Sequence, residues 1–503
     1  MDFKIKKLNE STVKLINTTE ELDLEISELY TYKVANYAAM KKNPRLRNWN
    51  GKICLYNKKS KTLDLGNWFH LYDTMESRGY KVDIDNSLFP VEKFKSRDEL
   101  ETVINEFIKP FDGENYIVPY DYQVEAIHHA IEMDRSVILS ATSSGKSLII
   151  YCLVWLYKNC FLEEHDGPIV VIVPDKGLVE QLYANFYEYS EGQSENWSQK
   201  INSDYEKYVT KDVVITTWQS LVKMPELIDE ASVMIVDEVH KAKAKQLTSI
   251  LQNARNCKYK HGLTGTLDGV EANETLIRGL FGPVAKFVSQ RELIDSGRAC
   301  DVKINIVGFR YSSRLVKQYE EEWEIWQKEK PWSDKYQFEI DFINKCEERN
   351  KMLLELVNFV EGNSFVLFHR KDTHGVQLYE KYKETHDDTY LITGDIKDRT
   401  DILTEFKQKN NAVLFATSSI MSTGISVNNL HNLFFASSQK AKVATIQSIG
   451  RLMRLHESKK VAHVFDIVDI IGKNNITQKH VDERIKHYNE EQIKYEISFI
   501  DID

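Results

Sequence analysis

A candidate phosphate-binding loop occupies residues 140–147, SATSSGKS, between the apolar run SVIL and the helix-like run LIIYCLVWLY. The order of strand, loop and helix suits a phosphate, because the free backbone N–H groups at a helix N-terminus bind anions. Lys146 is placed to reach the β and γ oxygens of a nucleotide, and Ser147 to bind Mg²⁺. The other loop residues expected to hold the nucleotide are Ser143, Ser144 and Gly145. Because Ser140 stands where the general pattern has a glycine, the run on its own is equally typical of an ordinary helix cap.

A pair of carboxylates follows a second apolar strand, where VMIV runs into Asp237 and Glu238. Asp237 suits the ligand shell of Mg²⁺, and Glu238 suits a general base that orients and deprotonates an attacking water. Acids are common where a strand simply meets solvent. Two of them in one chain with a phosphate loop favour nucleotide hydrolysis instead.

Three further segments that contain glycine are candidates for the same nucleotide chemistry. The chain has only 21 glycines, so we expect each of them to answer a backbone need. Arg451 and Arg454 lie on one face of a helix, where guanidinium groups can stabilise a transferring phosphoryl group. A structural arginine pair on a solvated helix is the competing interpretation, and it does not explain Gln447 and Gly450. The segments are GLTGT at 262–266, STGIS at 422–426 and QSIGRLMR at 447–454.

The elements around these residues alternate between apolar strand-like runs and helical patterns. This alternation predicts parallel sheets covered by helices, in two α/β domains of similar design. A charged stretch at 314–351 lies between the two series and predicts a helical connection. The first series of strand-like runs is SVILSA, IVVIVP, VVITT and VMIVDE, and the second, after Asn363, is SFVLFH, TYLITG, AVLFAT, NLFFAS and AHVFDIV.

Smaller elements flank these two domains. Ser96 and Glu99 form a capping box for a helix that ends near Pro110, which places the first domain boundary there. Upstream, Asn50-Gly51 between alternating apolar residues predicts a β-hairpin in a small N-terminal α/β domain. The polar end of the chain predicts a short helical tail. The predicted boundaries are 1–110, 111–300, 301–473 and 474–503.

Length and composition exclude several classes of protein. A chain of 503 residues is long enough for about three domains, so it is not a single small binding module. With 66 Lys and Arg against 76 Asp and Glu, the net charge is −10, and any site for a polyanion must be local. No apolar stretch approaches the roughly 20 residues of a membrane span, and the charged N-terminus does not resemble a secretory signal. We therefore expect a cytoplasmic protein, with all six cysteines reduced because their spacing fits neither a zinc site nor a disulfide framework.

One segment has the opposite charge balance. Between Thr31 and Lys61 the chain has nine positive residues and no Asp or Glu. Aromatic residues are interleaved with them, so the segment offers both attraction for phosphates and stacking for bases. Trp49 is also a candidate core anchor, which is the commoner role for one aromatic on a small hairpin. The residues expected to contact nucleic acid are Lys41, Lys42, Arg45, Arg47, Trp49 and Lys52.

Together, the motifs between about residues 119 and 456 resemble those of superfamily 2 helicases and translocases of the DExH kind. The resemblance implies two RecA-like domains in tandem that bind ATP and Mg²⁺ in the cleft between them. It implies that Gln123 reads the adenine, and that Arg451 and Arg454 are arginine fingers, with Gln447 helping to place the water. Gly424 would lie near both nucleotide and nucleic acid. The residues implied in coupling hydrolysis to movement are His240, Thr264 and Thr266, and those implied in nucleic-acid contact are Pro174, Thr217 and Gln219.

Two residues depart from the helicase pattern. Asp175 replaces a usual Thr in the first nucleic-acid motif, and Ser426 replaces an acid that often follows Gly424. The contacts expected of these two segments are therefore the least secure part of the resemblance.

A narrower resemblance spans nearly the whole chain. NPRLRNWNGKICLYN in the N-terminal domain, followed by ATSSGKS, DEVH, GLTGTL, STGISV and QSIGRLMR, is similar to the phage UvsW family of recombination helicases. This implies ATP-dependent unwinding and branch migration of D-loops, R-loops, Holliday junctions and stalled forks, in DNA recombination, repair and replication within the host cytoplasm. The motor motifs leave two alternatives open, because they contact mainly backbone phosphates. One is an RNA helicase or a duplex translocase without strand separation, and the other is a DNA-annealing or structure-binding protein regulated by ATP.

Overall fold

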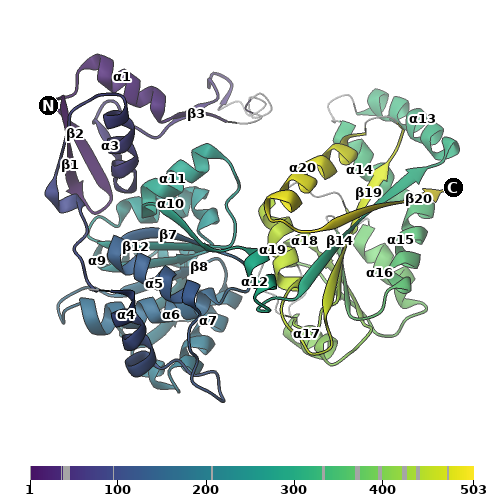
Figure 1. The fold of residues 1–503 in the computed structure, drawn as a ribbon. Coiled ribbons are helices and arrows are strands. Elements are labelled where there is room, and N and C mark those ends of the chain that lie inside the picture. Colours follow the sequence, from purple (N-terminus) through teal and green to yellow (C-terminus); the bar gives the residue numbers. More distant parts are fainter. Residues whose placement is uncertain are drawn as a thin grey trace. The chain divides into compact units, whose positions relative to one another are not determined.

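The computed structural model describes residues 2–34, 37, 46–94, 96–205, 208–330, 335–368, 374–394, 399–421, 427–437, 442–472 and 475–503. The chain forms two compact units: the first comprises Met1–Ser140 and Ser144–Val288, and the second comprises Ala141–Ser143 and Ser289–Asp503. Each unit contains a seven-stranded parallel sheet, and the first unit also carries a small mixed sheet (Figure 1). The predicted fold class is confirmed. Within the described ranges, no helix is long and apolar enough to cross a membrane.

The large sheet of the first unit has the strand order β13-β7-β12-β11-β8-β10-β9. Its central strands are runs of Val and Ile that are buried on both faces, as expected of a parallel sheet covered by helices. Helices α4 to α7 cover one face, and α10 and α11 cover the other (Figure 1). The strands are β7 (Arg135–Ser140), β8 (Ile169–Val173), β9 (Ser198–Ile201), β10 (Val213–Thr217), β11 (Val233–Asp237), β12 (Tyr259–Thr264) and β13 (Val284–Val288). The helices are α4 (Arg97–Val103), α5 (Asp121–Met133), α6 (Lys146–Leu156), α7 (Lys176–Tyr189), α8 (Trp218–Leu221), α9 (Pro225–Glu230), α10 (Lys245–Asn253) and α11 (Glu271–Phe281).

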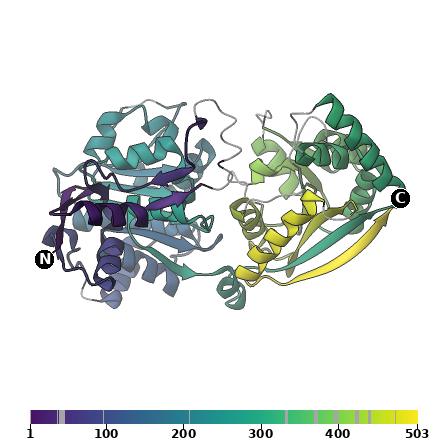
Figure 2. The same cartoon turned by 90° about the horizontal axis from the view of Figure 1, so that it is seen from above.

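The N-terminal domain belongs to this first unit and lies over the side that carries α10 and α11 (Figure 2). Its four-stranded sheet has the order β5-β2-β1-β6, and β3 pairs separately with β4. The strands are β1 (Phe3–Asn9), β2 (Thr12–Ile16), β3 (Thr31–Lys33), β4 (Lys52–Cys54), β5 (Thr62–Asp64) and β6 (Val82–Ile84), and the helices are α1 (Glu20–Leu29) and α3 (Trp68–Ser77).

The predicted hairpin at Asn50-Gly51 is wrong. Gly51 does adopt a left-handed conformation, with φ of 76°, but β4 after it pairs antiparallel with the distant strand β3. The strand that follows, β5, pairs with β2 instead. Local alternation of apolar residues identified the strands, but it carries no information about which distant strand completes each pair.

Ser96 is the N-cap of the predicted helix, since its hydroxyl accepts a hydrogen bond from the N–H of Glu99 at 3.3 Å. The helix it begins does not close the N-terminal domain, however. Leu100, Ile104 and Ile108 are buried in the core of the large sheet beside α5 and α6, whereas the N-terminal core ends at Leu88. Packing therefore assigns α4 to the first RecA-like domain.

The second unit is built on a sheet of order β16-β17-β15-β18-β19-β14-β20, in which all strands are parallel. The strands are β14 (Asp301–Tyr311), β15 (Ser364–Phe368), β16 (Thr389–Ile392), β17 (Val413–Thr417), β18 (Asn432–Phe435), β19 (Val461–Ile470) and β20 (Tyr495–Ile502). The helices are α12 (Gln290–Asp295), α13 (Ser313–Glu329), α14 (Lys335–Lys345), α15 (Glu347–Phe359), α16 (Val376–Lys383), α17 (Arg399–Lys407), α18 (Ser418–Met421), α19 (Lys442–Leu452) and α20 (Ile476–Glu490).

Two expectations for the second unit need correction. The described parts of the charged stretch at 314–351 form helices α13, α14 and the start of α15, but they do not connect the domains, because β14 before them already pairs with β19 and β20. The tail contains the predicted helix, α20, and then a strand, β20, at the edge of the sheet. Ile497 and Phe499 on β20 are more than half exposed, so the strand lacks the buried apolar pattern that identifies its neighbours.

Candidate nucleotide site and nucleic-acid contacts

The predicted phosphate loop joins β7 to α6, in the order that anion binding requires. Gly145 caps the helix in a left-handed conformation, with φ of 78°, and a Cβ there would lie 2.4 Å from Gln123 Nε2. Both facts restrict this position to glycine. Ser140, where the general pattern has a glycine, donates its hydroxyl to Ser144 Oγ at 2.6 Å, and Lys146 Nζ donates to the Ser140 carbonyl at 3.3 Å. The serine therefore ties the two ends of the loop together.

Gln123 and Tyr122 hold the same loop from α5. Gln123 Nε2 donates to the carbonyl of Ser144 at 2.9 Å, and the Tyr122 hydroxyl donates to that carbonyl at 3.0 Å. Gln123 Oε1 accepts from the N–H of Tyr120 at 2.8 Å. A carboxamide has a second N–H and a second lone pair, so Gln123 retains one donor and one acceptor for an adenine. Tyr122 was missed at the sequence level, because a tyrosine in an amphipathic helix is indistinguishable from a core residue.

The acidic pair lies at the same edge of the sheet as the loop. β12 separates β7 from β11, and the register aligns Leu139 with Thr264 and Asp237 with Leu263. Because all three strands are parallel, their carboxyl ends bring the phosphate loop, Thr264 and Asp237 together.

The two carboxylates differ electrostatically. Burial, reinforced by the neighbouring charge of Glu238, raises the pKa of Asp237 to about 7. Burial also opposes ionisation of Glu238, but its hydrogen bond with His240 and the positive charge of Lys146 outweigh this and lower the pKa of Glu238 to about 2. Glu238 is thus ionised, as a general base must be, while Asp237 is a partly buried oxygen ligand that a cation would stabilise.

Glu238 of the acidic pair forms a compact group with His240 and Thr264. His240 Nδ1 lies 3.2 Å from Glu238 Oε2 and 3.0 Å from Thr264 Oγ1. Thr264 Oγ1 in turn contacts the backbone of Thr266 at both its N–H and its carbonyl. The Thr266 hydroxyl is buried and has no hydrogen-bond partner among the residues that the structure describes. The structure therefore brings together the three residues predicted to couple hydrolysis to movement, which are His240, Thr264 and Thr266.

The residues predicted to contact nucleic acid in the first RecA-like domain follow β8 and β10, which are adjacent. Val173 pairs with Thr217, so Pro174 and Thr217 lie side by side at the carboxyl edge. Both are buried, and Thr217 Oγ1 accepts from the N–H of Ser220 as the cap of α8, whereas Gln219 is exposed. Asp175, the departure from the usual threonine, caps α7 by accepting from the N–H of Leu178 at 3.1 Å.

In the second RecA-like domain, α19 carries Gln447 and Arg451, and Arg454 follows it. The Arg451 guanidinium donates to the carbonyl of Met421. Burial, with a smaller contribution from Arg451, lowers the pKa of Arg454 to about 10. Lys459, which sequence reasoning missed, fixes the end of this helix by donating to the carbonyls of Leu452, Leu430 and Asn428 at 2.6 to 3.0 Å.

The basic N-terminal segment is only partly described. Lys41, Lys42, Arg45 and Gly424 lie outside the described residues. Arg47 and Lys52 are exposed, as a phosphate contact requires. Trp49 is half-buried and its indole N–H donates to the carbonyl of Lys52 at 3.0 Å, so it does not anchor the core.

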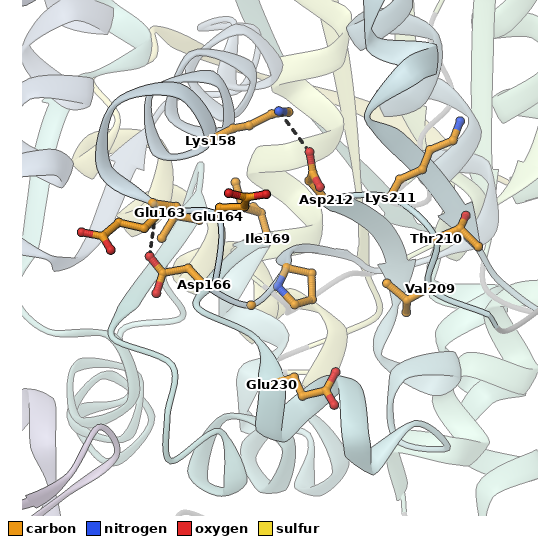
Figure 3. Close-up of a pocket in the computed structure, with 13 residues that line it drawn as sticks. Lys158, Glu163, Glu164, Asp166, Ile169, Val209, Thr210, Lys211, Asp212 and Glu230 are labelled. Atoms are coloured by element: carbon orange, nitrogen blue, oxygen red, sulfur yellow. Dashed lines mark hydrogen bonds and ion pairs between the residues drawn. The ribbon is translucent and has the colours of Figure 1, made fainter.

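A pocket of about 540 Å³ lies at the opposite, amino edge of the large sheet of the first unit, beside the starts of β8 and β10 (Figure 3). Its ionisable lining consists of Glu163, Glu164, Asp166, Asp212, Glu230, Lys158 and Lys211. Acids outnumber lysines, and Lys158 is paired with Asp212 at 3.0 Å, so the pocket does not suit a nucleotide. No cluster of three or more metal-ligating His, Cys, Asp or Glu side chains occurs in the described ranges.

Comparison with known proteins agrees with these features. The family model described as "Type III restriction enzyme, res subunit" matches residues 116–269, and "Helicase conserved C-terminal domain" matches residues 348–456. The ATP-dependent DNA helicase uvsW of Enterobacteria phage T4 is 29% identical over 528 aligned positions, which cover 100% of both chains. The crystal structure of T4 UvsW superposes with a TM-score of 0.52 at 28% identity, again over 100% of both chains. The putative ATP-dependent helicase IRC3 of Saccharomyces cerevisiae is 24% identical over 71% of this chain and 52% of its own length.

Proposed function

We propose that this chain, a superfamily 2 helicase that hydrolyses ATP, uses the energy of hydrolysis to unwind and branch-migrate branched DNA. The substrates proposed are D-loops, R-loops, Holliday junctions and stalled forks, which arise in recombination, repair and replication of phage type. The observation that carries the proposal is the end-to-end similarity to a phage DNA helicase, which includes the basic N-terminal segment and not the motor motifs alone.

The geometry of the nucleotide site supports the following proposed roles. The N-terminus of α6, with Gly145 and Lys146, would bind the phosphates, and Gln123 would read the adenine. Mg²⁺ fits the oxygen donors Asp237 and Ser147, and when bound it would neutralise charge on the phosphates. Glu238 would take the proton of the attacking water, because it is ionised and lies partly buried next to Asp237.

The other roles in the nucleotide site are assigned to the second domain and the coupling group. Arg451 and Arg454 would stabilise charge on the transferring phosphoryl group, with Gln447 placing the water. The coupling residues Thr264, Thr266 and His240 would respond to whether ATP or its products are bound, since they contact the general base Glu238 or one another.

The proposed DNA contacts lie on two surfaces of the first unit. Pro174, Thr217 and Gln219 share the carboxyl edge of the large sheet, where backbone contacts would hold a strand. The basic segment at 31–61 would add phosphate contacts, and stacking on Trp49 and its neighbours. Because neither phosphate contacts nor base stacking distinguishes one base sequence from another, preference for a junction would come from DNA shape.

The experiment that tests this function is steady-state ATP hydrolysis with Mg²⁺, measured alone and with each of four nucleic acids at equal nucleotide concentration. These are single-stranded DNA, duplex DNA, a synthetic four-way junction and single-stranded RNA. We expect the junction to stimulate most, followed by strand separation in an unwinding assay. Stimulation by RNA alone would favour an RNA helicase, and stimulation by duplex without unwinding would favour a translocase. A rate that no nucleic acid changes would favour a DNA-binding protein regulated by ATP.

A further inference from the structure

The N-terminal domain is fixed to the first RecA-like domain by a buried polar interface centred on Lys260. This lysine is 1% exposed and lies in the interior strand β12, whose residues are all buried. Its ammonium group donates to the carbonyls of Leu251 and Ala254 at 2.9 and 2.8 Å, and to Ser11 Oγ and the Glu10 carbonyl at 2.7 and 3.2 Å. It therefore caps the C-terminal end of α10, where a positive charge is favourable, and holds the β1–β2 turn of the N-terminal domain on that helix end.

A second buried cation acts on the same turn. Arg135, 6% exposed, donates to the carbonyls of Glu10 and Cys257. The N–H of Glu10 donates to the carbonyl of Arg255 at 2.9 Å, and the Ser11 hydroxyl donates to that of Ala254 at 2.9 Å. Separating the domains would break these bonds together, and buried polar groups are costly to leave without partners.

Close backbone packing closes the other end of the interface. A Cβ on Gly66 would lie 2.1 Å from the carbonyl oxygen of Arg278 and 2.6 Å from the backbone nitrogen of Gly282. The Asn67 side chain donates to the carbonyl of Thr275 at 3.2 Å and accepts from Arg278 Nε at 2.9 Å. The fit leaves no room for the N-terminal domain to slide along α11.

The basic segment and the catalytic strands are both attached to this interface. Tyr32, at the start of the segment, shares a hydrogen bond with Thr275 of α11 at 3.0 Å. Lys260 lies on the strand that ends at Thr264, and Arg135 begins the strand that ends at Ser140 of the phosphate loop. The interface is thus built on the two strands that lead to the nucleotide site.

We propose that the N-terminal domain and the first RecA-like domain move as one rigid body, so that DNA held by the basic segment is carried with the first domain through each ATP cycle. The proposal rests on the DNA-motor function proposed above. The N-terminal domain would then take part directly in the movement of DNA that each ATP cycle drives. It would not be a flexibly attached domain that only raises the local concentration of DNA.

A reversible lock tests this rigidity. A Cβ on Gly279 would lie 2.9 Å from Asp64 Cβ across the interface, about 0.6 Å less than the shortest span usual for a disulfide, and 2.5 Å from Asn67 Nδ2, so the bond can form after a small shift of these groups. The double variant D64C/G279C would be made in a background where the exposed Cys54 and Cys160 are serine. After oxidation, checked on a non-reducing gel, junction unwinding should equal that of the same protein after reduction. Unwinding that stops on oxidation and returns on reduction would show that the domain must swing, and would overturn the proposal.

An undocking variant tests whether the rigid connection matters. Gly66→Val forces the two domains apart at the backbone, and we expect unwinding per ATP hydrolysed to fall by about tenfold while ATP hydrolysis without DNA and junction affinity are retained. Gly79→Ala is the matched control, because a Cβ there meets nothing within 4 Å and only the left-handed backbone is strained. If G66V unwinds as well as G79A, the connection is unnecessary and the proposal fails. If the unmodified chain does not act on DNA at all, it is the proposed function that fails, so the two failures are distinguishable.

Discussion

Thr264 Oγ1 lies 3.3 Å from Glu238 Oε2, so the residue proposed as the general base touches the segment proposed to sense its state. Thr264 ends β12 and Glu238 directly follows the adjacent parallel strand β11, and His240 contacts both residues. A change in the charge or position of Glu238 on hydrolysis would therefore reach the β12 strand through hydrogen bonds.

Glu238→Gln should bind ATP and fail to hydrolyse it. The amide keeps the shape of the side chain but cannot accept the proton of the attacking water, so we expect turnover to fall by about 10² to 10⁴. Steady-state hydrolysis together with a titration of nucleotide affinity would separate the two effects. Lys146→Ala is the matched comparison, because it removes phosphate contacts and should lose both binding and turnover. Parental turnover in E238Q would show that another group is the base.

Thr264→Val should separate hydrolysis from movement. Valine keeps the volume of threonine but removes the hydroxyl that contacts Glu238, so junction unwinding should fall further than ATP hydrolysis, by about tenfold. The ratio of strands separated to ATP hydrolysed measures this directly. Thr264→Ser keeps the hydroxyl and should preserve the ratio. Equal losses of unwinding and hydrolysis in T264V would assign Thr264 to the chemistry and not to coupling.

The nucleotide site could be predicted from sequence because its signals are local. Buried runs such as IVVIV identify parallel strands by composition alone, and the phosphate loop and acidic pair directly follow such strands. The parallel order then places them at one edge without further information.

The features that sequence reasoning missed depend on contacts between distant residues. β3 pairs with β4 across a long connection, and β20 joins the sheet with exposed side chains, so neither carries a local pattern. Lys260 and Lys459 look like surface lysines in sequence, and only the fold shows that each caps the end of a helix. Once a buried strand has been identified, a lysine within it indicates that its ammonium group has buried hydrogen-bond acceptors, such as the carbonyls at a helix end.

Replacing Lys41, Lys42, Arg45 and Arg47 together by Ala should weaken DNA binding and flatten its dependence on salt. Removing one cation that neutralises a phosphate reduces the steepness of log affinity against log salt by about 0.9 on duplex DNA. Binding isotherms at several salt concentrations measure this slope, and ATP hydrolysis without DNA should be unchanged. As a control, removal of two positive charges at the amino edge, K158A/K211A, should leave DNA affinity intact. An unchanged slope in the quadruple variant would place the DNA contacts elsewhere.

The stability of the first unit should pass through a minimum near neutral pH because of Asp64 and Lys260. Burial raises the pKa of Asp64 from 3.8 to about 6, so between these values the folded state binds more protons and stability falls as pH rises. Burial, with repulsion from Arg135, lowers the pKa of Lys260 from 10.5 to about 7. Between those two values the unfolded state binds more protons, and stability rises with pH.

Urea unfolding at pH 5, 7 and 9 of the parent, D64N and K260M would test both limbs of this curve. Asn cannot titrate, so in D64N the free energy of unfolding should no longer fall as pH rises on the acid side. Its rise on the alkaline side should remain. Met fills the space of the lysine stem without a charge, so K260M should lose the alkaline rise even if the missing cap of α10 lowers its stability at every pH. A K260M curve that still rises above pH 7 in parallel with the parent would show that the Lys260 ammonium keeps an ordinary pKa in the interface.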